Sequence, residues 1–365
     1  MRVLVLIPDL NGPGGVAYYY RTLLGRFRHS VDYQVVGKRY AGRDWPPPIR
    51  VLIDWIRFAA RAWRYDVVHI NPSLCAKCFF RDIPFVWTAG MMGRRLLVFF
   101  RGWDTAFEEE IGRRWIRLFR WGYGRADACV VLAAAFEEAI RRWGYGGPTY
   151  RETTLVDERM LGCSPPRSEP GVFRILFMSR VERDKGIYEA TEAVRLMDDG
   201  HVELAVAGDG AERQPYEQYV REQSLRFVKM RGYLRGEEKS RAYQSAHVFL
   251  FPSTHGEGMP NAVLEAMAFG LPCIVCDAGG LRDFFVDGVM GFLLPYPDPV
   301  RLSACLRRMR DDADLRRRMS EGNAAYARER FLASAVVRRL EAIYEQMVRG
   351  GVSGVARSVH GRGQL

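Results

Sequence analysis

Short apolar runs alternate along this chain with longer segments in which apolar residues recur at helical spacing. This alternation predicts parallel β-sheets whose strands are joined by crossover helices. In the first half a helix is expected over 16–27, after a Gly-rich turn. Strands of this half are expected over 2–7, 32–36, 66–70, 85–88, 96–100 and 128–132.

The pattern breaks into turn residues at 163–171, which have the composition of a linker, and then starts again. Strands of the second half are expected over 173–178, 203–207, 227–230, 248–251 and 272–277. The chain is therefore predicted to be an α/β protein with two Rossmann-like domains, over 1–165 and 172–335. A helix over 336–350 could return to the first domain, and 351–365, rich in Gly, Ser and Arg, is expected to be a flexible tail.

The composition is that of an ordinary globular protein. With 365 residues, 48% of them apolar and 27% charged, the chain is long enough for two domains with sizeable cores. No apolar run approaches the roughly 18 residues of a membrane helix, and the run at 3–7 is too short for the core of a signal peptide. We expect a cytoplasmic protein, which could also lie peripherally on the cytoplasmic face of a membrane.

Two pairs of cysteines have the C-x-x-C spacing of zinc ligands, Cys75 with Cys78 and Cys273 with Cys276. The second pair lies in an expected strand, where residues three apart point to opposite faces and cannot bind one ion. The first pair has no second half at zinc-finger spacing. We therefore expect no metal site and interpret the thiols as reduced and partly buried.

The positive charge is concentrated in the first half. Residues 1–165 contain 25 Lys or Arg against 16 Asp or Glu, which is +9 of the total net charge of +11. Much of it is interleaved with aromatic residues over 51–64 and 113–121. Basic helices with Trp and Phe are typical of binding to anionic membranes, although helices that pack their aromatic residues inward would have the same pattern. Nucleic acid is not an expected partner, since no nucleic-acid motif accompanies the charge.

The turn after the first strand has Gly12, Gly14 and Ala17 at the spacing of a loose dinucleotide fingerprint. An NAD enzyme would need an acidic residue at the end of the second strand, where this chain has Arg39 instead. An NADP-dependent oxidoreductase that uses Arg39 is therefore an alternative. Gly14 and Gly15 could also let the backbone approach a phosphate or an acceptor at the start of the helix, or form only a tight structural turn.

In the second half, two groups of residues follow strands at the edge where open α/β sheets bind ligands. Arg180 and Lys185 follow the first strand and could neutralise a diphosphate. Glu257 lies in the loop after the fourth strand, and Glu265 lies inside the helix that begins there. The start of that helix offers free N–H groups to an anion. This arrangement is typical of an enzyme that binds a nucleotide-linked sugar.

Several motifs of the second half occur together in one family of enzymes. On the basis of these motifs, the chain resembles a retaining glycosyltransferase of the GT-B fold in glycosyltransferase family 4, the glycosyl transferases group 1. The resemblance covers nearly the whole chain, is strongest from 172 to about 320, and implies two Rossmann-like domains that face each other across a cleft. The motifs are Ser179-Arg180, Lys185-Gly186, Ala207-Gly208-Asp209-Gly210, Arg231-Gly232-Tyr233-Leu234, the segment Glu257 to Glu265, Ala278-Gly279-Gly280 and Asp287-Gly288-Val289-Met290-Gly291-Phe292.

The resemblance also implies roles for individual residues. Arg180 and Lys185 would contact the diphosphate of the donor, and Glu265 would bind the ribose hydroxyls. Glu257 would lie against the transferred sugar. The full set of implied donor-binding residues is Gly14, Gly15, Arg180, Lys185, Gly208, Tyr233, Gly258, Met259, Asn261, Ala262 and Glu265.

Enzymes of this kind are thought to retain the anomeric configuration because the acceptor attacks from the face that the diphosphate leaves, and the leaving phosphate can accept the proton. No divalent metal or other cofactor is needed for that. Glu257 and Arg101 are the expected catalytic residues, although many relatives have a histidine where this chain has Arg101. A guanidinium stays protonated, so Arg101 would instead bind a phosphate, a sugar hydroxyl or an acidic acceptor. We interpret His69 as a core histidine rather than a replacement.

The sequence leaves the substrates open. The donor would be a UDP- or GDP-linked sugar, and the acceptor a glycan or a lipid-linked molecule of polysaccharide, lipopolysaccharide or glycolipid biosynthesis, with a soluble acceptor as the alternative. Two other functions stay possible at this point. One is the NADP-dependent oxidoreductase, and the other is a catalytically degenerate GT-B protein that binds membranes.

Overall fold

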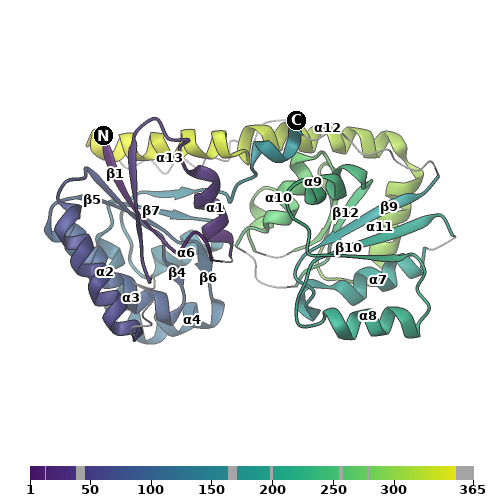
Figure 1. Cartoon of the computed structure of the whole chain (residues 1–365), viewed down its shortest axis with the longest axis horizontal. Helices are drawn as coiled ribbons and strands as arrows, with labels where there is room; N and C mark the ends of the chain where they lie inside the picture. The colour runs from purple at the N-terminus through teal and green to yellow at the C-terminus, as the bar shows by residue number, and fades with distance from the viewer. Residues whose placement is uncertain are drawn as a thin grey trace. The chain divides into compact units, whose positions relative to one another are not determined.

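The computed structural model describes residues 1–12, 14–37, 46–162, 171–197, 200–254, 258–277 and 279–350. The chain divides into two compact units (Figure 1). Unit 1 comprises Met1–Thr154 and the chain from Val336, and unit 2 comprises Leu155–Ala335. Each unit contains a parallel sheet of six strands, so the predicted α/β class is confirmed for both halves of the chain.

Unit 1 is built on one sheet whose neighbouring strands all run parallel. The strands are β1 (Arg2–Ile7), β2 (Ser30–Val35), β3 (Val67–Ile70), β5 (Arg95–Phe99), β7 (Ala128–Val131) and β8 (Thr149–Arg151), while β4 (Ser73–Leu74) and β6 (Gly102–Trp103) form a separate pair. The order in the sheet is β2-β1-β3-β5-β7-β8, so it reverses direction between β1 and β3. The strands β3 and β7 are buried along their whole length, as expected for a sheet that is covered on both faces.

Helices cover both faces of this sheet (Figure 1). They are α1 (Gly15–Leu23), α2 (Pro47–Ala62), α3 (Ala76–Met91), α4 (Thr105–Glu110), α5 (Ile116–Trp121), α6 (Ala134–Arg142) and α13 (Ala333–Val348), with the π-helical turn η1 (Ile111–Trp115) and the 3-10 turn η2 (Tyr123–Arg125). The helices α2 and α3 pack side by side, and α13, which belongs to unit 1 from Val336, lies on the opposite face.

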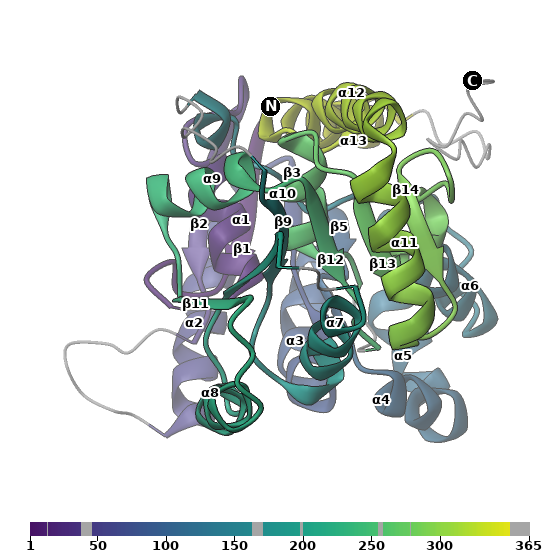
Figure 2. The same ribbon diagram turned by 90° about the vertical axis from the view of Figure 1, so that its right-hand side faces the viewer.

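Unit 2 repeats the same plan with a different strand order. Its strands are β9 (Phe173–Met178), β10 (Val202–Ala207), β11 (Val228–Gly232), β12 (Val248–Phe251), β13 (Cys273–Cys276) and β14 (Gly291–Leu294). They lie in the order β11-β10-β9-β12-β13-β14, all parallel, so the order reverses between β9 and β12 (Figure 2). This is the strand order of dinucleotide-binding folds, in which ligands bind beside the reversal point.

The helices of unit 2 pack in pairs over this sheet. They are α7 (Ile187–Arg195), α8 (Arg213–Glu222), α9 (Gly236–Ser245), α10 (Asn261–Ala268), α11 (Pro299–Asp311) and α12 (Ala313–Arg330), with the 3-10 turns η3 (Glu158–Gly162), η4 (Arg183–Lys185) and η5 (Gly279–Asp283). The helix α7 packs against α11, and α10 packs against α12. Asp298 and Asp312 cap α11 and α12, because each carboxylate accepts hydrogen bonds from N–H groups of the first turn.

One predicted strand is wrong. Residues 85–88 lie inside α3, although Pro84 removes one helical N–H there. Ile83, Val86 and Ala89 are all buried, and their spacing of three residues is that of one helix face. A short apolar run does not distinguish a strand from a buried part of a helix.

Other elements differ from the prediction in extent. The predicted helix 16–27 ends at Leu23, because Gly25 adopts a left-handed φ of 72°. The strands β8 and β14 were not predicted. Each is short, and β14 begins with Gly291, where an added Cβ would lie 1.8 Å from the carbonyl oxygen of Cys273.

The boundary between the units lies at Thr154–Leu155, before the predicted end of the first domain at 165. The reason is a pair of backbone hydrogen bonds in unit 2. The N–H of Val156 donates to the carbonyl of Phe331 at 2.8 Å, and the N–H of Ala333 donates to the carbonyl of Val156 at 2.9 Å. The predicted linker over 163–170 and the predicted tail over 351–365 lie outside the described residues.

The cysteine pairs lie in or next to regular secondary structure. Cys273 and Cys276 are buried in β13, while Cys75 precedes α3 and Cys78 lies within it. In the described ranges, no group of three or more His, Cys, Asp or Glu side chains could hold a metal ion. None of the helices described above is both long and apolar enough to cross a membrane.

A buried cluster of hydrogen bonds joins β3 to two helices of unit 1. The Nδ1 atom of His69 lies 2.7 Å from the hydroxyl of Tyr344 on α13, and the Nε2 atom lies 3.4 Å from the hydroxyl of Tyr20 on α1. His69 is fully buried, so its predicted core position is confirmed. Burial and the nearby charge of Arg101 lower the pKa of His69 to about 3. The imidazole is therefore neutral at pH 7.

We predict that His69 makes the folded protein sensitive to acid. Its pKa is about 6.5 in an unfolded chain and about 3 in the fold, so the unfolded state takes up the proton first as the pH falls. Stability is therefore present above pH 6.5 and is lost toward pH 3. Between pH 7 and pH 5 the loss due to His69 is about 2 kcal/mol.

Urea unfolding of the wild type and of His69→Asn at both pH values tests this. The free energy of unfolding should fall less for His69→Asn than for the wild type. His201→Asn, which changes an exposed histidine, is the control and should follow the wild type. An equal loss in wild type and His69→Asn would contradict the prediction.

Candidate functional site

The carboxyl ends of β9 and β12 carry many of the predicted donor-binding residues of unit 2. The strand order reverses between these two strands, which is where open α/β sheets bind ligands. Arg180 and Lys185 follow β9, and the segment 258–262 follows β12. The two loops lie side by side, because the N–H of Thr254 donates to the carbonyl of Asp184 at 2.9 Å.

Gly186 permits this close approach. Its φ is 74°, which is left-handed, and a Cβ at this position would lie only 2.2 Å from the carbonyl oxygen of Pro252. Glycine alone satisfies both conditions without strain. Because Gly186 separates η4 from α7, the contact with Pro252 fixes where Lys185 lies relative to the loop after β12.

A second close contact joins the loops after β9, β10 and β11. A Cβ on Gly208 would lie 1.8 Å from the carbonyl oxygen of Ser179, and the N–H of Gly208 donates to the carbonyl of Gly232 at 2.8 Å. Gly208 and Tyr233 therefore lie on adjacent loops of the same sheet edge. The Tyr233 side chain is exposed, and the guanidinium of Arg235 lies 5.0 Å from the centroid of its ring.

The two predicted cations differ in environment. Arg180 is exposed and pairs with Glu182 at 2.8 Å. Lys185 is only 1% exposed. An ammonium group at this depth is not an ordinary solvated surface charge. Lys185 is therefore the cation that the fold holds in place at this edge, whereas Arg180 can change its orientation.

The start of α10 presents the predicted N–H groups. Pro260 precedes the helix, and Asn261 and Ala262 occupy its first positions, where N–H groups have no acceptor within the helix. The Oδ1 atom of Asn261 is buried and has no hydrogen-bond partner in the part of the chain that the structure describes. Met259 is largely buried just before the helix. Asn261 and Ala262 therefore offer backbone N–H donors at the start of α10.

Glu265 lies inside α10, as predicted, and is 1% exposed. Its carboxylate accepts hydrogen bonds from the Nζ of Lys239 at 2.7 Å and from the hydroxyl of Tyr243 at 2.8 Å. Both partners come from α9. A carboxylate has about four lone-pair positions, so these bonds orient Glu265 and leave acceptor capacity for a further hydroxyl donor.

Two predicted residues lie outside the described residues. They are Glu257, expected to face the sugar, and Arg39 of the alternative dinucleotide site. The remaining predicted residues fall into two sets. Those of unit 2 gather at one sheet edge, and Gly14, Gly15 and Arg101 belong to unit 1.

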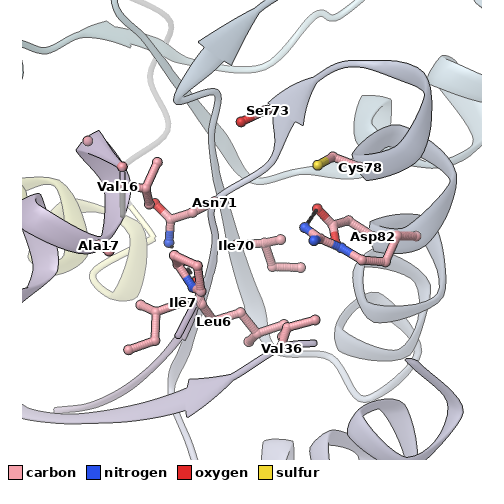
Figure 3. Close-up of a pocket in the computed structure, with 14 residues that line it drawn as sticks. Leu6, Ile7, Val16, Ala17, Val36, Ile70, Asn71, Ser73, Cys78 and Asp82 are labelled. Carbon is pink, nitrogen blue, oxygen red and sulfur yellow. Dashed lines mark hydrogen bonds and ion pairs between the residues drawn. The ribbon is translucent and has the colours of Figure 1, made fainter. Parts of the chain in front are cut away.

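Unit 1 has a cavity of about 250 Å³ at its own point of strand reversal (Figure 3). The ends of β1 and β3 and the start of α1 line it, so Gly14 and Gly15 both contribute. Gly14 precedes α1 with a φ of 121°, a conformation that favours glycine. Its polar lining comprises Asn71, Ser73 and the ion pair of Arg81 with Asp82, and none of these was predicted from the sequence. Asn71 and Ser73 are the two that follow a strand. Both follow β3 directly, and the rule applied to unit 2 would have found them.

Arg101 lies at the end of β5, beside the segment that lines this cavity. Its backbone N–H donates to the carbonyl of Pro72 at 2.9 Å. The guanidinium carbon lies 3.7 Å from the ring centroid of Tyr19 and 4.4 Å from that of Phe99. The residue is only 8% exposed, so Arg101 is a buried cation of unit 1.

Comparisons with known proteins agree with this geometry. Residues 166–326 match the family described as glycosyl transferases group 1. A glycogen synthase of Mycobacterium tuberculosis is 27% identical over 266 residues, which cover 69% of this chain and 62% of that protein. The amylovoran biosynthesis glycosyltransferase AmsK of Erwinia amylovora is 33% identical over 144 residues, 37% of this chain and 35% of that protein. The chain thus spans less than two thirds of the length of these relatives.

Among solved structures, Anabaena Alr3699/HepE in complex with UDP and glucose has a TM-score of 0.71 at 16% identity, over 94% of this chain and 99% of that chain. At this identity the likeness concerns the fold. The likeness shows that the chain has the GT-B fold. Residues 166–326, the region in which the sequence motifs lie, are similar to the glycosyl transferases group 1.

The contact at Gly186 predicts a specific difference in stability. Gly186→Ala and Gly232→Ala both place a Cβ on left-handed backbone, with φ of 74° and 67°, which costs roughly 1–2 kcal/mol. Only the Cβ at Gly186 meets backbone, since nothing lies within 4 Å of one at Gly232. We expect Gly186→Ala to lower the free energy of unfolding by at least about 2 kcal/mol more than Gly232→Ala. Urea unfolding measures both, and equal losses would argue against the contact with Pro252.

Proposed function

We propose that this chain is a retaining glycosyltransferase that moves a hexosyl group from a nucleoside-diphosphate donor to a glycan or lipid-linked acceptor. The observation that carries the proposal is the meeting of the loops after β9 and β12. It brings the buried Lys185 to the same sheet edge as the start of α10. A fixed cation and free helix N–H groups at one edge suit a diphosphate.

The proposed reaction breaks the bond between the anomeric carbon of the sugar and the diphosphate oxygen. The acceptor hydroxyl attacks the anomeric carbon from the face that the diphosphate leaves, and its proton passes to the leaving phosphate. Lys185, Arg180 and the N–H groups of Asn261 and Ala262 would stabilise the charge that develops on the diphosphate. The proposal requires neither a metal nor a cofactor.

Further roles follow from the placement of the other residues. Glu265, oriented by Lys239 and Tyr243, would accept hydrogen bonds from the ribose hydroxyls. Tyr233 lies on the adjacent exposed loop and would contact the base. Glu257 would bind the transferred sugar. Gly14 and Gly15 would offer backbone to an acceptor or a phosphate at the cavity of unit 1.

For the donor we propose UDP-linked sugars first and GDP-linked sugars second. The complex of Alr3699/HepE with UDP and glucose supports this order for a protein of the same fold. For the acceptor we propose a glycan or glycolipid precursor of a polysaccharide or lipopolysaccharide. The name of AmsK, which places that relative in amylovoran biosynthesis, supports an acceptor of this kind.

An NADP-dependent oxidoreductase fits unit 1 poorly. The cavity beside Gly14 measures about 250 Å³, whereas pockets for drug-sized ligands usually measure about 300–1,000 Å³. A space of this size suits a phosphate or a small polar group better than a dinucleotide. We therefore do not favour the alternative.

We also propose that the protein works on the cytoplasmic face of a membrane and contacts it through α2. Leu52 and Ile56 lie on one side of this helix, and Trp63 follows its end at the same helical spacing. These side chains are 52%, 54% and 58% exposed. Arg57 and Arg64 are exposed beside them. An apolar stripe with basic flanks has the chemistry of an interfacial helix on anionic lipid.

The other basic aromatic segment, 113–121, packs mainly within unit 1. Phe119 is buried, and the ring of Trp115 lies 5.1 Å from that of Phe80. Trp121 packs against Trp87 with ring centroids 4.3 Å apart. Trp115 and Phe119 therefore pack within unit 1, while Trp121 stays 46% exposed beside Trp87. We assign the membrane surface to α2 alone.

Nucleotide binding and donor hydrolysis test the proposed activity. We expect UDP or GDP to raise the melting temperature of the protein by several degrees, since a ligand at 100 times its Kd stabilises by about 2.7 kcal/mol. Lys185→Met should abolish this shift and reduce donor turnover at least about 100-fold, because a fixed positive charge is lost. Arg180→Ala should cost less, since Arg180 is exposed.

Lys229→Met is the control, because it makes the same substitution at an exposed lysine in β11. It should leave nucleotide binding and turnover unchanged. If no nucleotide stabilises the protein and Lys185→Met behaves as the wild type, the proposed function is wrong. Nucleotide binding with no turnover for any candidate acceptor would instead support the degenerate GT-B alternative.

Vesicle sedimentation tests the membrane surface. The double variant Leu52→Ser/Ile56→Ser should bind anionic phosphatidylglycerol vesicles at least about tenfold more weakly than the wild type, because burying each half-exposed side chain contributes about 1 kcal/mol. Val300→Ser removes an exposed apolar side chain of unit 2 and should bind as the wild type. Equal binding by the double variant would show that α2 does not meet the membrane.

A further inference from the structure

We propose that Arg101 is an oxyanion-binding residue of unit 1, which recognises a carboxylate or phosphate group on a substrate. The inference deepens the proposed function, since it names a chemical requirement of a substrate of the same enzyme. It rests on the burial of Arg101, on its lack of a counter-charge among the described residues and on the position of its backbone beside the cavity.

The guanidinium of Arg101 is buried with unused donors. The residue is 8% exposed, and its Nε and Nη1 atoms have no hydrogen-bond partner within the described ranges. A guanidinium is always charged and offers five donors. Leaving charged donors unpaired in the interior lowers the stability of the fold. An anion that accepts hydrogen bonds from these atoms would recover that loss.

The aromatic and imidazole groups around Arg101 do not neutralise it, and Glu152, whose charge also acts on Tyr19, is bound to Arg339. Burial raises the pKa of Tyr19 and Tyr20, and burial together with Arg101 lowers the pKa of His69 to about 3. All three side chains are neutral at pH 7. The rings of Tyr19 and Phe99 hold the guanidinium by cation–π contact and supply no charge. No ion pair joins Arg101 to any residue that the structure describes.

Two other arginines of unit 1 are each neutralised by a carboxylate of the same chain. Arg339 binds the buried Glu152 through two nitrogens at 2.8 Å each. Arg81 binds the buried Asp82 at 2.6 and 2.8 Å. Both pairs satisfy charge and hydrogen bonds within the chain. Arg101 differs from both, which points to a partner that is not part of the protein.

The position of Arg101 indicates where such an external anion would bind. Pro72, whose carbonyl accepts the hydrogen bond from the Arg101 backbone, lies between Asn71 and Ser73, and both of these line the cavity (Figure 3). Tyr19, on which the guanidinium stacks, belongs to α1, whose first turn lines the same cavity. Arg101 does not itself line the cavity but lies behind the lining segment. We place the acidic oxygens of a bound group toward Arg101 and its hydroxyls toward Asn71 and Ser73.

Thermal unfolding of the full chain in buffers of equal ionic strength tests the inference. The probes are inorganic phosphate and glucuronate, with chloride as the reference anion and glucose as the neutral sugar. We expect at least one of the two oxyanions to raise the wild-type melting temperature by about 2–4 °C over chloride. Arg101→Met and Arg101→Gln should lose this rise. In chloride, both should melt at or above the wild-type temperature, because a buried unpaired charge has been removed.

Arg339→Met is the matched control, because it removes a guanidinium that has a partner. It leaves Glu152 buried without its counter-charge, so it should melt below the wild type and yet keep the response to the oxyanion. A response to phosphate alone would assign the group to a phosphorylated substrate. A response to glucuronate, with or without phosphate, would assign it to an acidic sugar.

Two results would overturn the inference. One is a wild type that responds to neither oxyanion, or variants that respond as the wild type does. The other is a fall in the melting temperature of both Arg101 variants in chloride as large as that of Arg339→Met, which would show a structural role. The nucleotide shift of unit 2 should persist in both Arg101 variants. A wild type whose melting temperature does not rise with nucleotide would count against the proposed function and not against the inference on Arg101.

Discussion

The site in unit 2 depends on two places where backbone meets backbone with no room for a side chain. At Gly186 and at Gly208 an added Cβ would lie 2.2 and 1.8 Å from a carbonyl oxygen of the neighbouring loop. These contacts hold the loops after four parallel strands at one edge of the sheet. The proposed donor site depends on this, because those loops bring Lys185, Tyr233 and the start of α10 to the same edge of the sheet.

The central strands could be predicted because a strand buried on both faces is a continuous apolar run, as in β3, β7, β12 and β13. The same property explains the error at 85–88, since a buried turn of helix has the same local composition. The strand β14 could not be predicted from its own residues. It begins at Gly291, which is needed because the neighbouring strand lies too close for a Cβ, and a sequence does not show that proximity.

The sequence predicted which residues belong to the candidate site, but not how buried they are or which partners they bind. Arg180 and Lys185 look alike in the sequence, yet one is exposed beside Glu182 and the other is buried. Burial depends on how α7 and the loop after β12 pack, which no local pattern records. Likewise Glu265 was expected to bind the ribose hydroxyls, but its partners Lys239 and Tyr243 come from a different helix and could not be named from the sequence. Charge type follows from sequence, while hydrogen-bond capacity and mobility follow from the fold.

Arg101 shows how a cost in stability can indicate function. A buried guanidinium needs a partner, and a chain selected for stability alone would supply a carboxylate, as this one does for Arg339 and Arg81. A neutral residue of similar volume would also remove the cost. Neither solution is present at Arg101, although Tyr19 and Phe99 hold its guanidinium in one orientation. A cation that is fixed by aromatic rings, with no counter-charge among the residues that the structure describes, is organised for an anion that arrives with a substrate.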